Sequence, residues 1–208
     1  MRSPKSVDGL TKLGRVRLSD SFFMRDFLFS EISQIEGVSN IPDNPDLAIE
    51  VGKMLCSEVL EPIQEKLGRI SIRSAFRSAA VNQIGNEKKY NCASNEANYA
   101  GHIWDHLDSD GCKGATACIV VNSFIPYYEE TGNWQALAWW IHDNIPSYAD
   151  LEFYPKYAAF NISWYEGEAS KSIRSYIAPK GCLTKLGMKN QEEDHSEIYA
   201  EYLQSIEI

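Results

Sequence analysis

The chain contains four histidines, and histidine beside acidic residues is the combination that most often holds a metal ion. His102 and His106 are four residues apart, so on a helix they would share one face, as in helical zinc sites. With His142 they form one candidate ligand set. No Glu accompanies them in the zincin arrangement, and the acids that follow, D-S-D-G at 108–111, are typical of a turn. The ligand spacing of an EF-hand is also absent, so we expect no calcium loop there.

Arg77 is the second candidate for chemistry, within the segment I-R-S-A-F-R-S at 72–78. A guanidinium can donate two parallel hydrogen bonds to a carboxylate, so Arg77 could hold an anionic peptide terminus. The alternative is an ion pair that only braces the surrounding loop. Further on, Cys92 and Ser94 are nucleophilic residue types. No general base is placed beside them by the sequence, which favours an ordinary loop of turn-forming residues.

These residues need elements that position them, and apolar spacing predicts which ones. The longest predicted helix runs from Pro45 to Leu67, where Pro62 is expected to kink it. Ser78 opens a short helical turn, and a long polar loop spans 85–113. We further expect an extended arm over 1–18, helices over 19–35, 134–141 and 197–206, and strands over 70–76, 115–121, 151–154, 157–164 and 173–177. Helices first and strands later predict an α+β fold.

Size and composition limit the classes of function. At 208 residues and 23.5 kDa the chain forms one domain comfortably, and two only with difficulty. A net charge of -9 argues against nucleic acid as a partner. No apolar run approaches about 18 residues, so we expect no membrane span, and no apolar stretch follows the basic start as in a secretory signal. Synthesis in a cytoplasm, with the five cysteines as free thiols, is therefore expected.

Charge is distributed unevenly between the two ends of the chain. Residues 1–17 hold five basic residues and one acid, whereas 191–208 is rich in Glu and Asp. We therefore divide the chain into a basic N-terminal arm (1–18), a domain (19–182) and an acidic C-terminal tail with a short helix (183–208). Charge runs are commonly just solvated surface, and the alternative is that these ends engage neighbouring copies or another protein.

Several motifs in order resemble those of the M15 family of zinc peptidases, which includes D-Ala-D-Ala carboxypeptidases and phage endolysins. The segment at 72–78, followed by Asn82, resembles the family signature S-G-Y-R-S-x-x-x-N. The helix end before it, with L-E-P at 60–62 and L-G at 67–68, also resembles the family, and the similarity covers most of 20–165. The resemblance implies helices packed on a small, mostly antiparallel sheet. It also implies that Arg77, with Ser74 and Asn82, binds the substrate.

The family's zinc ligands, two His and one Asp, are matched only in part. His102 resembles the first ligand, Cys118 stands where the Asp is expected, and Asn161 stands where the second His is expected. A neutral amide is a poor ligand for Zn²⁺, although Cys118 could still bind as a thiolate. We therefore predict a degenerate site that holds no zinc, unless His106 and His142 replace the lost ligands.

The resemblance and the damaged site together predict an M15 peptidase-like domain without catalysis. It would serve as a structural or binding component of a phage particle or bacterial assembly, with protein partners. The alternative is a zinc-dependent D,D- or L,D-peptidase that acts on peptidoglycan peptides through a rebuilt metal site.

Overall fold

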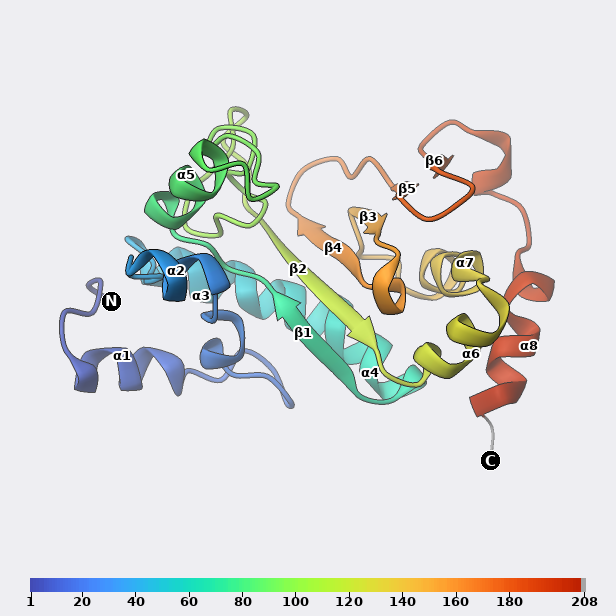
Figure 1. Cartoon of the computed structure of the whole chain (residues 1–208), viewed down its shortest axis with the longest axis horizontal. Helices are drawn as coiled ribbons and strands as arrows, with labels where there is room; N and C mark the ends of the chain where they lie inside the picture. The colour runs from blue at the N-terminus through green and yellow to red at the C-terminus, as the bar shows by residue number, and fades with distance from the viewer. Residues whose placement is uncertain (207–208) are drawn as a thin grey trace.

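The computed structural model describes residues 1–206 as one α+β domain, which confirms the predicted fold class (Figure 1). The helical elements are α1 (Val7–Gly14), η1 (Met24–Phe27), α2 (Glu31–Glu36), α3 (Pro45–Leu55), η2 (Cys56–Leu60), α4 (Glu61–Leu67), α5 (Ala79–Glu87), α6 (Phe124–Thr131), α7 (Trp134–Asn144), η3 (Lys156–Ala158), η4 (Lys189–Gln191) and α8 (Ser196–Ile206). The strands are β1 (Ile70–Ser74), β2 (Gly114–Val121), β3 (Asp150–Phe153), β4 (Phe160–Tyr165), β5 (Ser172–Ser175) and β6 (Gly181–Thr184).

The strands form a single sheet in the order β1-β2-β4-β3-β5-β6. Each neighbouring pair is antiparallel except β3 and β5, which run parallel. The sheet is therefore mostly antiparallel, as expected. None of the helices within residues 1–206 has the length and apolar character needed to cross a membrane.

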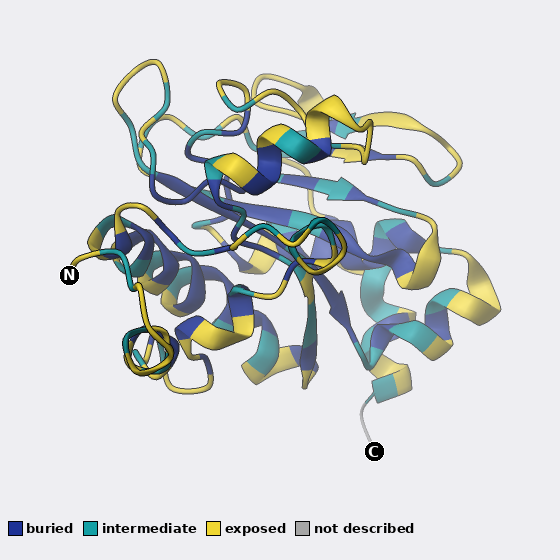
Figure 2. Ribbon diagram, turned by 60° about the vertical axis from the view of Figure 1, so that its left-hand side comes forward, coloured by how far each residue is buried: buried dark blue, intermediate teal, exposed yellow. Residues whose placement is uncertain are grey.

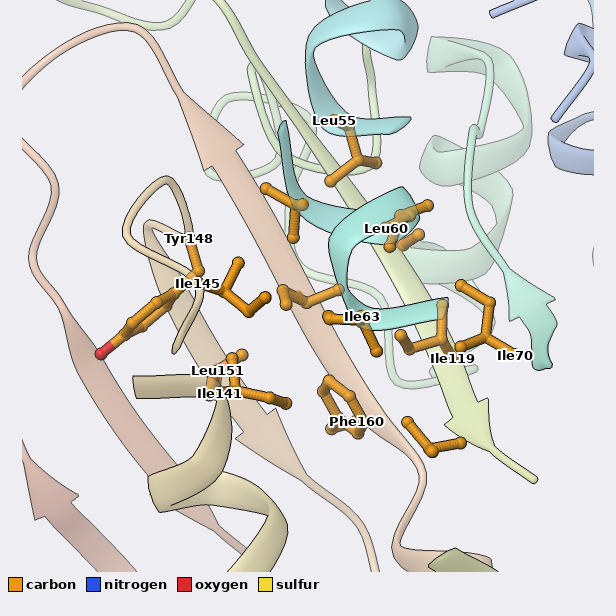
Figure 3. Packing of buried hydrophobic residues seen from close by; sticks show 14 of the residues in the cluster. Leu55, Leu60, Ile63, Ile70, Ile119, Ile141, Ile145, Tyr148, Leu151 and Phe160 are labelled. Carbon is orange, nitrogen blue, oxygen red and sulfur yellow. The ribbon is translucent and has the colours of Figure 1, made fainter. Parts of the chain in front are cut away.

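One face of the sheet carries the hydrophobic core. Leu55, Leu60 and Ile63 from the α3–α4 segment pack towards Ile119 of β2 and Phe160 of β4, and all five side chains are fully buried (Figure 3). Buried residues concentrate along the strands and the inner sides of the helices, and many connecting loops are exposed (Figure 2). Because successive side chains of a strand alternate between faces, the opposite face of the sheet is left to polar residues.

The long helix predicted over 45–67 is present, but its irregularity lies before Pro62 and not at it. Asn44 caps the start, where its side chain accepts a hydrogen bond from the backbone of Leu47. The helix then widens into the π-helical turn η2 before α4 begins. Proline has no N–H to donate to the preceding turn, and a π turn is one way for a helix to accommodate the missing bond.

Two predictions about the N-terminal region were wrong. Residues 1–18 do not form an extended arm, because Ser6 caps helix α1 and the side chain of Leu13 is buried in the core. The single helix predicted over 19–35 is instead the short η1 followed by α2, with Ser30 as the cap of α2. Ser19, a capping residue type at the start of the predicted range, donates to the carboxylate of Glu61 instead of capping a helix.

The end of the chain differs in part from the prediction. Helix α6 and strand β6 were missed, the latter within a segment that has the composition of a turn. The short terminal helix is confirmed as α8, and it is attached to the domain by Tyr202. That side chain is fully buried and packs edge-on against Phe124 of α6.

The long loop between α5 and β2 has little regular structure, but it is fastened at many points. Asn98 is its centre: its side chain donates to Asn82 of α5 and accepts from the backbone of His102. The loop also lies directly against the start of β2, because a side-chain Cβ at Gly114 would be 2.2 Å from the carbonyl oxygen of Ala100. Only glycine permits that approach.

We therefore predict that Gly114→Ala destabilises the fold by at least about 2 kcal/mol, because the loop backbone has to move away from β2. In a chain of this size that corresponds to a drop of about 4–8 °C in the melting temperature. Thermal unfolding followed by circular dichroism measures it. An unchanged melting temperature would show that the loop is not held against β2 in this way.

Candidate functional site

Most of the site residues predicted from the sequence line one pocket. Ser74 of β1, Arg77, His102, Cys118 of β2 and Asn161 of β4 surround a cavity of about 300 Å³. They come from segments far apart in the sequence, so their convergence is a property of the fold. The pocket lies on the polar face of the sheet, away from the helices α3 and α4.

The strand register explains why three of these residues meet. Ser74 of β1 pairs with Cys118 of β2, and Cys118 pairs with Asn161 of β4. Residues directly opposite each other in neighbouring strands have side chains on the same face, about 4.5–5.5 Å apart at Cβ. Asn161 in turn pairs with Glu152 of β3, so one polar row crosses four strands.

His102 reaches this row from the loop and is held by a hydrogen bond of its ring. Its Nδ1 lies 2.7 Å from the carbonyl oxygen of Ala75, and the side chain of Asn161 is a neighbour of the ring in the pocket. A carbonyl oxygen only accepts, so Nδ1 carries the proton and donates it, which leaves Nε2 of the neutral ring as an acceptor. Burial, with a smaller effect of the nearby Arg77 charge, lowers the pKa of His102 to about 3. His102 is therefore neutral at physiological pH.

Cys118 and Asn161 give this pocket little affinity for a metal. Burial raises the pKa of the Cys118 thiol to about 11, so the thiolate form that zinc requires is disfavoured. The amide of Asn161 donates from Nδ2 to the hydroxyl of Tyr154 at 3.0 Å, and that hydroxyl donates to Glu152 at 2.5 Å. The position that would hold a second ligating His is thus committed to a hydrogen-bond chain within the protein.

Arg77 sits at the other side of the pocket, joined to His102 through the backbone. The backbone N–H of Arg77 donates to the backbone carbonyl of His102 at 2.8 Å, and the side-chain Nη1 donates to Sγ of Cys92 at 2.6 Å. Within residues 1–206 Arg77 makes no ion pair with a carboxylate, and its buried Nε has no hydrogen-bond partner. Burial lowers the pKa of this guanidinium. A partly buried cation with an unused, buried donor is well suited to an anionic ligand.

Three predicted residues lie elsewhere. Asn82 does not line the pocket: it is fully buried, and its amide donates to the carbonyl of Ala93. His106 stacks on Tyr99 and contacts Asp105. His142 lies on α7, where Nδ1 is 2.6 Å from the hydroxyl of Tyr148 and Nε2 donates to the carbonyl of Gln191. These two histidines do not join His102 in a rebuilt site.

Within the described chain, no cluster of three or more His, Cys, Asp or Glu side chains could hold a metal ion. The donor set at the predicted zinc position is one imidazole, one buried thiol and one amide. Structural and catalytic zinc sites use three or four Cys, His, Asp or Glu ligands, so the residues present do not fit zinc.

A second cavity, about 820 Å³, adjoins the first and shares His102 and Asn161 with it. Apart from His102 and Asn161, the sequence analysis assigned no ligand-binding role to the residues that line it. The acids of that lining include Asp150 and Glu152 of β3, and burial raises the pKa of Asp150. The alternation of polar and apolar residues in β3 and β4 was the signal available, because it marks one face of the sheet as polar.

Comparison of the chain with protein-family models, curated proteins and solved structures gave no match.

The neutral state of His102 has a measurable consequence for stability. In the unfolded chain the imidazole takes up a proton near its ordinary pKa of 6.5, whereas in the native state it does so only near 3. Between these values the unfolded state binds more protons, so stability falls as the pH is lowered. We predict that urea unfolding of the native chain loses about 1.4 kcal/mol more per pH unit between about pH 6 and 4 than unfolding of His102→Gln does. Parallel pH profiles for the two proteins would contradict a buried neutral His102.

Proposed function

We propose that this chain is a non-catalytic M15 peptidase-like protein that binds the carboxylate end of a peptide at Arg77. It would serve as a binding or structural component of a phage particle or bacterial assembly. The observation that carries the proposal is the partly buried guanidinium of Arg77, which faces a pocket and has no carboxylate partner within residues 1–206.

Electrostatics favours an anion in this pocket. Removing a guanidinium from water is costly unless charge-assisted hydrogen bonds replace the lost hydration. The thiol of Cys92 is a weak acceptor and serves only Nη1. A ligand carboxylate could accept from the remaining N–H groups in the two-pronged arrangement that suits arginine. The resemblance of the segment at 72–78 to the M15 signature supports the same role for Arg77.

The lack of catalysis rests on the residues beside Arg77. An M15-type hydrolysis requires zinc to activate water, and His102, Cys118 and Asn161 are a poor set of zinc ligands. His102 cannot easily replace the metal as a general base either, because burial keeps its pKa near 3 and it takes up a proton poorly at neutral pH. The pocket therefore retains the means to bind a peptide, without the means to cleave it.

The adjoining cavity gives the rest of such a peptide a place to lie. The two cavities meet at His102 and Asn161, so a chain anchored at Arg77 can pass along the polar face towards β3. The lining there includes the acids Asp150 and Glu152 and the bases Arg174 and Lys185, so it can hold both a cationic and an anionic group of a ligand. Peptides of the bacterial cell wall have both kinds of group, and we propose them as the ligand class.

The test of ligand binding uses an N-acetylated peptide that ends in D-alanyl-D-alanine, together with the same peptide as its C-terminal amide. We predict that calorimetry detects binding of the free acid and much weaker binding of the amide. Arg77→Gln should weaken binding of the acid about 10- to 100-fold, because it removes charge-assisted hydrogen bonds worth about 1.5–3 kcal/mol.

Arg69→Gln is the matched control, because Arg69 is exposed and outside the pocket. It should leave the affinity for the acid unchanged. Equal affinity for acid and amide, or equal loss in both variants, would remove Arg77 from the role of carboxylate anchor.

The origin of the pocket as a zinc site can be tested by restoring its ligands. We predict that Cys118→Asp with Asn161→His gains tight binding of about one zinc per chain, at least about 100-fold tighter than the unaltered protein, because both positions face His102. A chromophoric chelator in competition measures the affinity. Cys182→Asp with Asn86→His makes the same changes outside the pocket and should gain none.

The competing function, a zinc peptidase, predicts different results. His102 has the orientation of a metal ligand, because ligating histidines commonly donate their other N–H to a carbonyl. If the unaltered protein, purified without chelator, holds about one zinc and cleaves the acetylated peptide, it is an enzyme. Metal-free, inactive protein that binds the peptide supports the proposal.

A further inference from the structure

The N-terminal end of the molecule has a strongly basic surface. We call it the basic end, and it consists of Arg2, Lys5, Lys12 and Arg15, on helix α1 and beside it. All four are exposed, and none makes an ion pair within residues 1–206. Apolar side chains lie among them: Val7 is 82% exposed and Leu10 37% exposed, although both belong to α1. The outer side of α1 therefore combines positive charge with uncovered apolar surface.

The C-terminal end of the molecule has the opposite charge. We call it the acidic end, and it consists of Glu192, Glu193, Asp194, Glu197 and Glu201, in α8 and the residues before it. These five carboxylates are also exposed and make no ion pair in the described chain. Ile198, on the same helix, is 39% exposed. Each end thus presents apolar surface among charges that are mostly of one sign, with Asp8 as the exception on α1.

The two ends lie far apart in the molecule. With the longest axis horizontal, α1 is at one extreme and α8 at the other, with the sheet between them (Figure 1). The basic end therefore cannot neutralise the acidic end of its own chain. In a second copy of the chain the same surfaces are free to meet.

We infer that copies of this chain associate head to tail, with the basic end of one on the acidic end of the next. The second copy is the partner that the charges specify, since the chain itself supplies both complementary surfaces. Helix α1 of one copy would lie against α8 of its neighbour, with Val7 and Ile198 at the apolar centre and the charges around them. Charge around an apolar centre is the usual arrangement of a specific interface.

Such a contact uses two different surfaces, so it is heterologous and leaves one basic and one acidic end unused in every dimer. Further copies can then add, which gives an open filament or a closed ring. No pocket residue takes part, so failure of this inference would leave the proposed peptide binding at Arg77 untouched.

Sedimentation velocity of the full chain tests the inference. We expect the average mass to rise with protein concentration at about 0.05 M salt and to fall at about 0.5 M, because salt screens exposed charges. Reversing the basic end in Lys12→Glu with Arg15→Glu, or the acidic end in Glu193→Lys with Glu197→Lys, should each weaken self-association at least about tenfold.

Mixing the two variants is the decisive experiment. The first keeps an acidic end and the second keeps a basic end, so the native contact can form between them, and their two reversed ends are also complementary in charge. We expect an equimolar mixture to regain the self-association that each variant alone has lost. Circular dichroism melting of each variant verifies that it is folded.

The matched control, Lys66→Glu with Lys89→Glu, changes the net charge by the same amount at exposed positions away from both ends. It should associate like the unaltered chain. The inference is overturned if the unaltered chain stays monomeric up to about 1 mM. It is also overturned if the control loses association as strongly as the end variants, or if the mixture remains monomeric.

Discussion

The register of β2 between β1 and β4 is the constraint on which the site depends. It places Ser74, Cys118 and Asn161 in one row, and the bulge between Ile72 and Ser74 keeps the end of β1 in line with that row. A slip of β4 by one residue relative to β2 would turn Asn161 into the core and bring an apolar neighbour from β4 to the pocket beside Cys118. The same alternation directs Ile119 and Phe160 into the core, so packing energy enforces the geometry of the polar face.

The polar side chains of the pocket differ in how completely they are hydrogen-bonded within the protein. Around His102 the hydrogen bonds are internal: its ring is bonded to Ala75, and the neighbouring Asn161 is bonded through Tyr154 to Glu152. Such a satisfied network is rigid and has little reason to admit a metal. Around Arg77 the partners are incomplete, since Nε has none within residues 1–206. We propose that the first group shapes the pocket and the second receives the ligand.

Much of the architecture followed from the sequence because its signals were local. The apolar run of β2 and the periodic helix from Pro45 predicted their elements, and the ordered motifs predicted that Arg77, His102, Cys118 and Asn161 would share one pocket. The failures were non-local. Nothing in the sequence told that Ser30 and not Ser19 caps a helix, because Ser19 is taken by Glu61, 42 residues away. Asn82 was expected to contact ligand, whereas its partners lie in a loop that has no periodicity.

The state of His102 Nε2, free or bound to a metal, is the property that separates a peptide-binding pocket from a zinc peptidase. Long-range nitrogen–proton NMR on protein labelled with ¹⁵N-histidine reads it directly, because protonated, unprotonated and metal-bound ring nitrogens have distinct shifts. At neutral pH we expect a neutral His102 ring with the proton on Nδ1, and no change when one equivalent of zinc is added. A shift of Nε2 to the metal-bound range with stoichiometric zinc would contradict the proposal that this pocket binds without metal.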